Sequence, residues 1–372
     1  MQFKAKLGML AAAMALSFGA QGANVTLYGS VSTGVVLSGT AKLTDADTVE
    51  KRSTNLAMES AWAGDSIFGL TGEEELGNGW TVGFTLENEF SSDSGQLASD
   101  GTIFDSQAYL RIGNEFVNIA AGNIGGLASA CGDFDLVGGF DPLEAAYGVG
   151  GMGVFASRDY ASANTAVVEL TPAEGLKISA MGSFGEEDKN ASWAARTHYY
   201  GIGVSYEAGP LAVAAVAEMM NYDSSEDKQD NGYTYTVGVS YDFEVVKPMF
   251  MYQHADKVLG FQGEDIESSL KADSFLIGAT APLGSGTLAA SAQYLKAKDA
   301  ETGAKAEATV LGVAYTYEMS KRTSLYAGAT YAFGGKGLGK NLSGADAEFG
   351  ALADLRGDFN GWQAGIGINH AF

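Results

Sequence analysis

The sequence is poor in the residues that build disulfide frameworks, metal centres and nucleophilic sites. Its 372 residues include one cysteine, Cys131, and three histidines, His198, His254 and His370. A single cysteine cannot form an intramolecular disulfide, and the histidines are too scattered to form an i, i+4 metal-binding pair. No G-x-S-x-G nucleophile elbow occurs. We therefore predict no catalytic residues, no metal site, no cofactor and no enzymatic activity.

Basic residues are also scarce. Lysine and arginine together number 22 against 45 aspartate and glutamate residues, which gives a formal net charge of −23. Nucleic-acid binding requires a basic surface, so the composition argues against a nucleic-acid partner.

Long apolar runs are absent except at the N-terminus. There, an apolar run from Leu7 to Phe18 follows Lys4 and Lys6 and precedes small residues up to Gly22. The run is too short to cross a bilayer, and no stop-transfer pattern follows it, so a signal peptide is favoured over a membrane anchor. We predict a secretory signal peptide over residues 1–22 and an exported mature chain over residues 23–372. Export of a chain of this size without disulfides is typical of a bacterial envelope protein.

The sequence is rich in glycine, tyrosine and phenylalanine, and its side chains alternate in character. In residues 80–89, apolar side chains such as Trp80 and Phe84 alternate with polar ones such as Thr81 and Glu87. This period of two predicts strands with one apolar and one wet face. Sixteen such strands are predicted: 24–37, 66–73, 80–89, 104–113, 117–123, 164–170, 176–184, 198–207, 211–220, 232–243, 245–255, 274–282, 287–297, 308–318, 323–333 and 361–372.

The predicted connections alternate between tight turns and long, polar, acidic loops. Short turns at one end and long loops at the other are typical of an up-and-down barrel whose ends face different compartments. An even number of strands with alternating faces indicates an all-β fold, a transmembrane antiparallel barrel of sixteen strands. A secreted β-sandwich also alternates, but aromatic residues near the strand ends, Trp80, Tyr206, Tyr241, Tyr317 and Trp362, favour the membrane barrel.

The longest irregular segment covers about residues 124–157. It is glycine-rich and apolar, and it carries Asp133, Asp135, Asp141 and Glu144. Structureless loops of this length are uncommon unless they are functional or disordered, and the apolar composition argues against disorder. We predict that this segment folds into the barrel. Its GVGGMG run at residues 148–153 formally matches a dinucleotide fingerprint, but the required βαβ frame is missing.

Several stretches resemble the general porins of Gram-negative outer membranes: IFGLTGEEELGNGWTVGFTLE at 67–87, FDSQAYLRIGNEFVNIAAGN at 104–123, SKRTSLYAGATYAF at 320–333 and the terminal Phe372. The resemblance implies a homotrimer of sixteen-stranded barrels with water-filled pores for ions and small hydrophilic solutes. It also implies an inward-folded third loop that constricts the pore. Phe372 resembles the signal that the barrel-assembly machinery reads.

The resemblance also concerns the charges of the constriction. Such porins usually carry arginines where Ile67 and Asn123 stand here, and Arg158 matches a third. Two members of the expected basic cluster are therefore missing, while the acidic loop side is kept. Because pore-lining charge sets ion preference, we predict a cation-preferring pore. By alternation, Arg111, Thr71, Thr81 and Glu87 are expected on the lumen wall.

The other long loops are acidic as well, and this is most simply explained by solvation. They could also bind divalent cations shared with lipopolysaccharide, although no calcium-loop spacing occurs. The leading hypothesis is an outer-membrane diffusion porin surrounded by outer-membrane lipid. Two alternatives stay open, a substrate-specific channel and a barrel that serves as an adhesin or scaffold.

Overall fold

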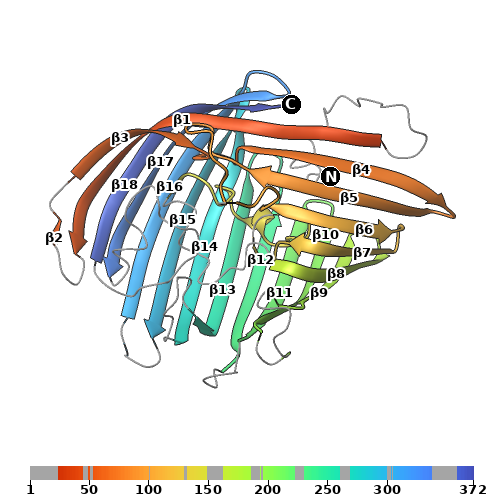
Figure 1. Cartoon of the computed structure of the whole chain (residues 1–372). Coiled ribbons are helices and arrows are strands. Elements are labelled where there is room, and N and C mark those ends of the chain that lie inside the picture. The colour runs from red at the N-terminus through yellow and green to blue at the C-terminus, as the bar shows by residue number, and fades with distance from the viewer. Residues whose placement is uncertain are drawn as a thin grey trace.

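The chain folds into a single antiparallel sheet that closes on itself (Figure 1). The computed structural model describes residues 24–44, 49–50, 53–99, 101–129, 132–148, 162–185, 193, 196–222, 230–259, 269–299, 303, 305–336 and 358–372. The predicted signal peptide, residues 1–22, lies outside the described residues. The strands are β1 (Asn24–Thr44), β2 (Val49–Glu50), β3 (Ser53–Ser60), β4 (Ile67–Gly77), β5 (Trp80–Glu89), β6 (Gln107–Gly113), β7 (Val117–Ile124), β8 (Ser162–Ala173), β9 (Leu176–Ser183), β10 (His198–Ala208), β11 (Leu211–Asn221), β12 (Gly232–Tyr241), β13 (Lys247–Leu259), β14 (Ser269–Leu283), β15 (Gly286–Asp299), β16 (Lys305–Glu318), β17 (Thr323–Lys336) and β18 (Asp358–Ala371).

The eighteen segments make sixteen wall strands. Segments β2, β3 and β4 pair in succession with β1, so together they form one interrupted strand between β1 and β5. The remaining strands pair in chain order, and β18 pairs back onto β1. Because the sheet closes into a ring, it has no free end strand, which is the condition for a sheet to cross a bilayer. The prediction of a sixteen-stranded antiparallel barrel is confirmed.

The first predicted strand was too short. It was expected to end at Leu37, with a loop up to residue 65, but β1 continues to Thr44 and β3 pairs with its second half. The reason is that the alternation continues on both strands. Leu56 and Met58 of β3 project outward, with 67% and 61% exposure, from a stretch whose intervening residues are polar or small.

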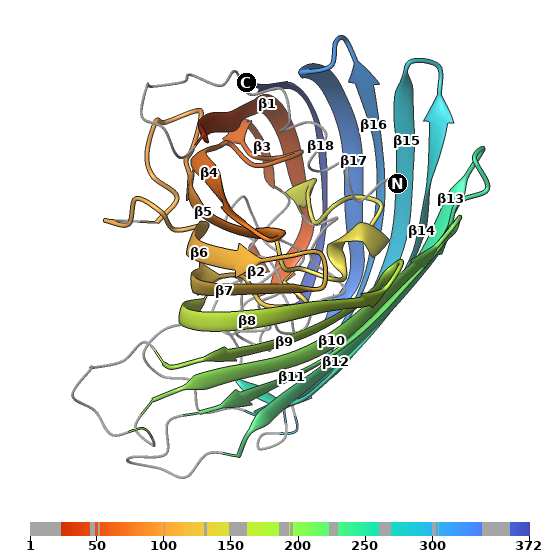
Figure 2. The same ribbon diagram turned by 90° about the vertical axis from the view of Figure 1, so that its right-hand side faces the viewer.

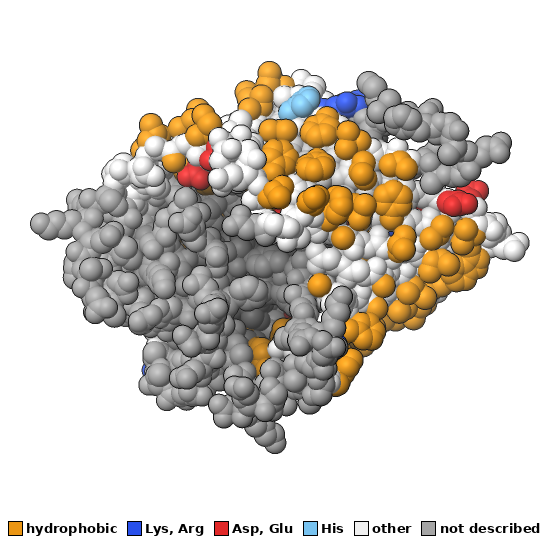
Figure 3. All heavy atoms as spheres, in the orientation of Figure 1, with side chains coloured by type: hydrophobic (Ala, Val, Ile, Leu, Met, Phe, Trp, Pro, Cys, Tyr) orange, Lys and Arg blue, Asp and Glu red, His pale blue; other side chains and the backbone are white. Residues whose placement is uncertain are grey.

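Side chains alternate between the two faces of the wall as predicted. On β12, Thr234, Thr236 and Ser240 are buried inside, while Tyr235, Val237, Val239 and Tyr241 are exposed outside. The outer surface therefore carries broad fields of apolar side chains (Figure 3). This outward-apolar arrangement is the reverse of a water-soluble protein and matches a lipid environment. Among the described residues, no helix is long and apolar enough to cross a membrane.

The wall is uneven in height. Strands β6, β7 and β9 have 7 or 8 residues and β8 between them has 12, whereas β13 to β18 have 13 to 15. Figure 1 shows the short strands on one side and the tall ones on the other. The tight turns all lie at one end of the barrel, and at this end Phe372 exchanges two backbone hydrogen bonds with Gly29, of 3.0 and 3.3 Å.

Candidate functional site: the interior of the barrel

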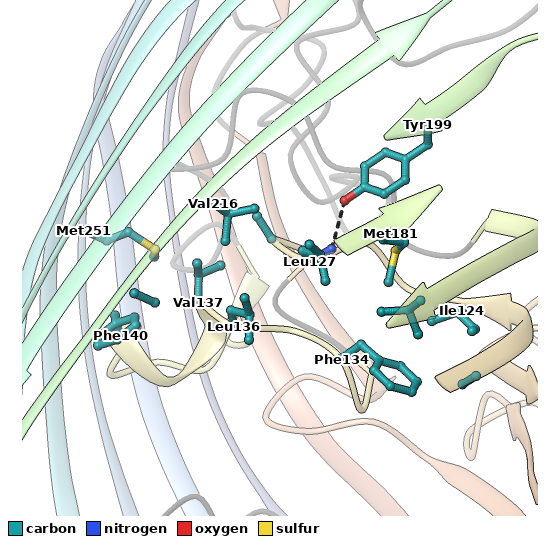
Figure 4. Close-up of a cluster of buried hydrophobic side chains, with 14 of the residues drawn as sticks. Ile124, Leu127, Phe134, Leu136, Val137, Phe140, Met181, Tyr199, Val216 and Met251 are labelled. Atoms are coloured by element: carbon teal, nitrogen blue, oxygen red, sulfur yellow. Dashed lines mark hydrogen bonds between the residues drawn. The ribbon is translucent and has the colours of Figure 1, made fainter. Parts of the chain in front are cut away.

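The segment that follows β7 lies inside the ring of strands (Figure 2). Its only regular element among the described residues is a 3-10 turn at Gly138–Phe140. Ile124, Leu127, Val137 and Phe140 are buried in a cluster with inward side chains of the wall (Figure 4). The Leu127 amide donates a hydrogen bond of 3.0 Å to the Tyr199 hydroxyl. The described part of the predicted segment, residues 124–129 and 132–148, lies inside the barrel as expected, and residues 149–157 lie outside the described residues.

Glycines of the wall make room for the loop. Each of them faces inward on a different strand, and a β-carbon at that place would collide with a loop side chain. The pairs are Leu136 with Gly203 of β10, Phe140 with Gly238 of β12, Pro142 with Gly278 of β14, Leu143 with Gly312 of β16, and Tyr147 with Gly328 of β17. The loop is thus fitted to the inner wall from β10 to β17, which is half of the barrel.

The far end of the described loop is held by the gap between β3 and β4. Trp62 lies in this gap, and its carbonyl accepts a hydrogen bond of 2.6 Å from the Tyr147 amide. The Trp62 ring packs edge-on against Tyr147, with ring centroids 5.1 Å apart, and both contact Tyr326 of β17. Burial raises the pKa of the Tyr147 phenol, so it stays neutral. This aromatic cluster fills the barrel on the side of β1, β17 and β18.

A network of acidic and hydroxyl groups covers the inward side of β5 and β6. The Glu87 carboxylate accepts hydrogen bonds from the Tyr28 hydroxyl at 2.8 Å and from the Ser106 hydroxyl at 2.6 Å. Asp133 connects the loop to this network, because its carboxylate accepts a hydrogen bond from Tyr109 and its amide donates one of 3.0 Å to the Gln107 side chain. None of these partners carries a positive charge.

More carboxylates follow toward the long-loop end. Asp105 accepts hydrogen bonds from the Asn88 amide group at 3.3 Å and from the backbone amides of Glu89 and Ser106 at 3.0 and 3.1 Å. Glu89 lies within electrostatic reach of Asp105 and Asp65. No group of three or more acidic, histidine or cysteine residues in the described part of the chain is arranged to hold a metal ion.

Among the described residues, two inward bases on this side of the barrel are paired with carboxylates. Arg111 contacts Glu73 at 2.5 Å, and Lys177 contacts Glu169 at 3.0 Å. Each pair is neutral as a whole, so within the described part of the chain Glu87 and Asp133 have no basic partner. Arg111 faces inward as predicted, but it compensates Glu73 rather than the acidic network.

The four predicted loop carboxylates differ in their surroundings. Asp133 is exposed inside the barrel, and Glu144 is also exposed, with a left-handed φ of 53°. Asp135 accepts a hydrogen bond of 2.7 Å from the Gly138 amide. Asp141 is only 2% exposed, and its two oxygens accept hydrogen bonds of 2.9 Å from the amides of Leu143 and Ala145. Asp141 therefore holds a turn of the loop, which is a structural contribution.

The predicted wall positions also differ. Ile67 pairs with Glu89 and lies on the inward side, two residues along from Gly69, which faces the Tyr28 ring. Asn123 pairs with Ala108, on the side opposite to Tyr109, and its side-chain amide donates to the carbonyls of Phe104 and Asp105 at 3.4 and 3.0 Å.

The other predicted residues lie at the margins of the network or outside it. Thr71 donates to the Phe84 carbonyl at 3.0 Å, and Thr81 shares the inward side of β5 with Glu87. Phe372 lies against Gly29 at the tight-turn end. Arg158 and Cys131 lie outside the described residues, so their predicted positions stay predictions.

Sequence reasoning did not name Tyr28, Tyr109 or Trp62 as residues of the site. The tyrosines had a usable signal, because both occupy inward positions of strands that the alternation identified. Trp62 had none, since it lies in a gap that interrupts a strand.

Comparisons with known proteins agree with this architecture. A family model described as Gram-negative porin matches residues 8–337. An outer membrane porin protein of Bordetella pertussis is 30% identical, covering 99% of this chain and 100% of the relative. Outer membrane porin protein 32 of Delftia acidovorans is 26% identical over 99% of this chain and 100% of that protein.

Solved structures show the same fold. An anion-selective porin from Comamonas acidovorans superposes with a TM-score of 0.70 at 23% identity, covering 94% of this chain and 100% of that one. The trimer form of OmpT of Vibrio cholerae gives a TM-score of 0.64 at 15% identity, covering 94% and 99%.

Proposed function

The chain belongs to the Gram-negative porin family, whose members are passive outer-membrane channels and not enzymes, and on the charges inside its barrel we propose that its pore prefers cations. The pore would conduct ions and small hydrophilic solutes by diffusion. The narrowest part would lie between the loop of residues 124–148 and the inward side of β4 to β6. Ile67, Thr71, Thr81, Glu87, Arg111 and Asp133 would line it or its approaches.

The observation that supports the sign of the preference is the charge of this region. Glu87 and Asp133 are held by neutral donors, and the nearby Arg111 is paired with Glu73. A fixed negative potential in a narrow aqueous passage concentrates cations and repels anions. One structural relative is described as anion-selective, but at 23% identity its likeness concerns the fold alone.

Planar-bilayer recordings under a KCl gradient test this proposal. We expect the reversal potential to have the sign that results when K⁺ crosses the pore more easily than Cl⁻. Its magnitude should decrease as the salt concentration rises, because salt screens the wall charges. A reversal potential of the opposite sign would overturn the cation preference. Absent conductance would overturn the open pore and favour an adhesin or scaffold.

The uneven wall supports a homotrimer. Seven residues span about 23 Å along a strand, or about 18 Å across the membrane at a tilt of about 40°, less than the apolar band of about 25 Å. The short strands β6, β7 and β9 would therefore face neighbouring subunits, and the tall strands would face lipid. The pair Leu110→Arg and Ile277→Arg tests this, since the two side chains are 64% and 65% exposed on the short and the tall wall.

In native mass spectrometry, Leu110→Arg is expected to yield folded monomers. Ile277→Arg is expected to lower the amount of inserted protein and to leave the trimers that do form intact. Trimers of unchanged stability in the Leu110 variant would contradict the assignment of the interface to the short wall.

The two ends of the chain complete the proposal. Residues 1–22 would be removed on export, leaving residues 23–372 as the barrel, and Phe372 would serve the assembly machinery. N-terminal sequencing of the protein from outer membranes tests the first point. A mature chain that still begins at Met1 would contradict it.

A further inference from the structure

Three lysines stand abreast on the outer surface of the tall wall. Lys271 of β14 is directly opposite Lys298 of β15, which is directly opposite Lys305 of β16. All three are exposed, and their direct strand neighbours Ala272, Ala297 and Ala306 are buried on the inward side. The lysine row therefore points away from the pore.

This row is electrostatically unusual. Like charges directly opposite each other destabilise a sheet, because their β-carbons lie about 5 Å apart. Lys271 has one exposed partner, Asp256, at 3.8 Å. Across the described residues, Lys298 and Lys305 have no acidic partner, in a chain whose acids outnumber its bases two to one. An anion outside the chain would remove the repulsion.

The next rows of outward side chains toward the middle of the strands differ from the lysine row, and they indicate how deep the lysine row lies in the membrane. In the next row on the same face, imidazole or ammonium groups alternate with carboxylates: His254, Asp273, Lys296 and Glu307 lie opposite one another, and His254 bonds to Asp273 at 2.7 Å. The row after that is aromatic, with Tyr252, Phe275 and Tyr294. Aromatic girdles mark the boundary between hydrocarbon and headgroups. The lysine row lies four residues beyond it, about 13 Å along the strand and at headgroup level.

The position of the lysine row in the barrel indicates which leaflet of the membrane it contacts. Long loops of such barrels are extracellular, and the lysine row is at the long-loop end. Strand β14 is the twelfth of the sixteen wall strands and β6 the fourth, so the row lies opposite the short wall. With the short wall facing neighbouring subunits, as proposed above, the row is placed to meet lipid of the outer leaflet.

We propose that Lys271, Lys298 and Lys305 form a binding site for the phosphate groups of a bis-phosphorylated glycolipid of the outer leaflet. Three ammonium groups on neighbouring strands span about 10 Å, because strands lie about 4.8 Å apart. One phosphate would lie between Lys271 and Lys298 and the other between Lys298 and Lys305, so that each phosphate contacts two ammonium groups and both contact Lys298. Tyr294 and Phe275 below would contact the upper part of the acyl chains.

The test compares two double variants of the full-length protein that remove the same charge. K298Q/K305Q removes the two lysines that have no acidic partner in the described part of the chain, and K247Q/K321Q removes two lysines at the tight-turn end. Each protein is reconstituted in phosphatidylcholine nanodiscs with increasing amounts of bis-phosphorylated lipid A, and bound lipid is measured by native mass spectrometry.

We expect K298Q/K305Q to bind lipid A at least tenfold more weakly, K298R/K305R to bind as the wild type does, and K247Q/K321Q to be unchanged. Conductance should stay the same in all variants, which separates this site from the pore. Unchanged binding in K298Q/K305Q, or an equal loss in K247Q/K321Q, would overturn the site. Equally tight, lysine-dependent binding of phosphatidylglycerol would overturn the assignment to a bis-phosphorylated glycolipid.

Discussion

The ring of Phe140 in the interior loop lies against the α-carbon of Gly238 on β12, so close that a β-carbon there would overlap the ring. Phe140 is 2% exposed and belongs to the buried cluster that fixes the loop to the wall. The position of Phe140 in the loop thus depends on the lack of a side chain at Gly238, which lies more than 90 residues further along the chain.

Gly238→Val is expected to displace Phe140 and loosen the loop. Limited proteolysis of the folded barrel would reveal this as faster cleavage within residues 125–148. Overpacking of a well-packed site typically costs about 1–3 kcal/mol. The double variant Gly238→Val/Phe140→Ala should recover much of the resistance, because the removed ring makes room for the valine. Additive losses in the double variant would show that the two residues do not act on each other.

The double variant Glu87→Gln/Asp133→Asn is expected to weaken the cation preference of the pore. Both changes keep hydrogen-bonding groups of nearly the same size and remove only the negative charge. The measurement is the reversal potential in a KCl gradient, with the tight-turn residue Glu207→Gln as the matched control. A reversal potential as large as that of the wild type in the double variant would show that these carboxylates do not set the selectivity.

Arginine substitutions at two wall positions test which side of its strand each position faces. Ile67→Arg is expected to move ion preference toward anions, because this position lies inside, opposite Glu89. Asn123→Arg is expected to have a smaller effect, because the Asn123 side chain is turned to the carbonyls of Phe104 and Asp105. Equal shifts would contradict the register that places the two residues on different sides.

Asp141→Ala is expected to destabilise the loop without a large change in selectivity. The change removes the acceptor of two backbone amides in a buried turn, and a buried amide left without a partner costs about 1–3 kcal/mol. Glu144→Ala, at an exposed loop position, is the control. Protease resistance of the loop checks the prediction, and a loss of selectivity with intact resistance would instead place Asp141 in the pore lining.

Much of the fold could be predicted because a barrel strand carries its own signal. The alternation in residues 232–243 indicated which side chains face lipid, and β12 has that alternation. The tight turns were equally readable, since turns such as Asn78–Gly79, where both residues have left-handed φ angles, favour glycine and asparagine. The extension of β1 to Thr44 was missed because polar strands at the membrane rim resemble loops.

The candidate site was only partly predictable, because an irregular loop has no period. Asp133 and Asp141 look alike in the sequence, yet one joins the acidic network and the other holds a turn. Asp133 lies in the loop, and its partners Tyr109 and Gln107 lie on strand β6. No local sequence pattern connects the loop residue with these partners. Asn123 was assigned to the pore by resemblance, whereas strand register turns it away from Tyr109.

By itself, the sequence determined the barrel, its sixteen strands and the inside and outside of most of them, because each property follows from a period of two within a few residues. Only the tertiary structure decided which carboxylates share one space, which bases are neutralised, and that Lys271, Lys298 and Lys305 stand in one row. These relationships join residues on different strands, and they depend on register, which closure of the whole barrel sets.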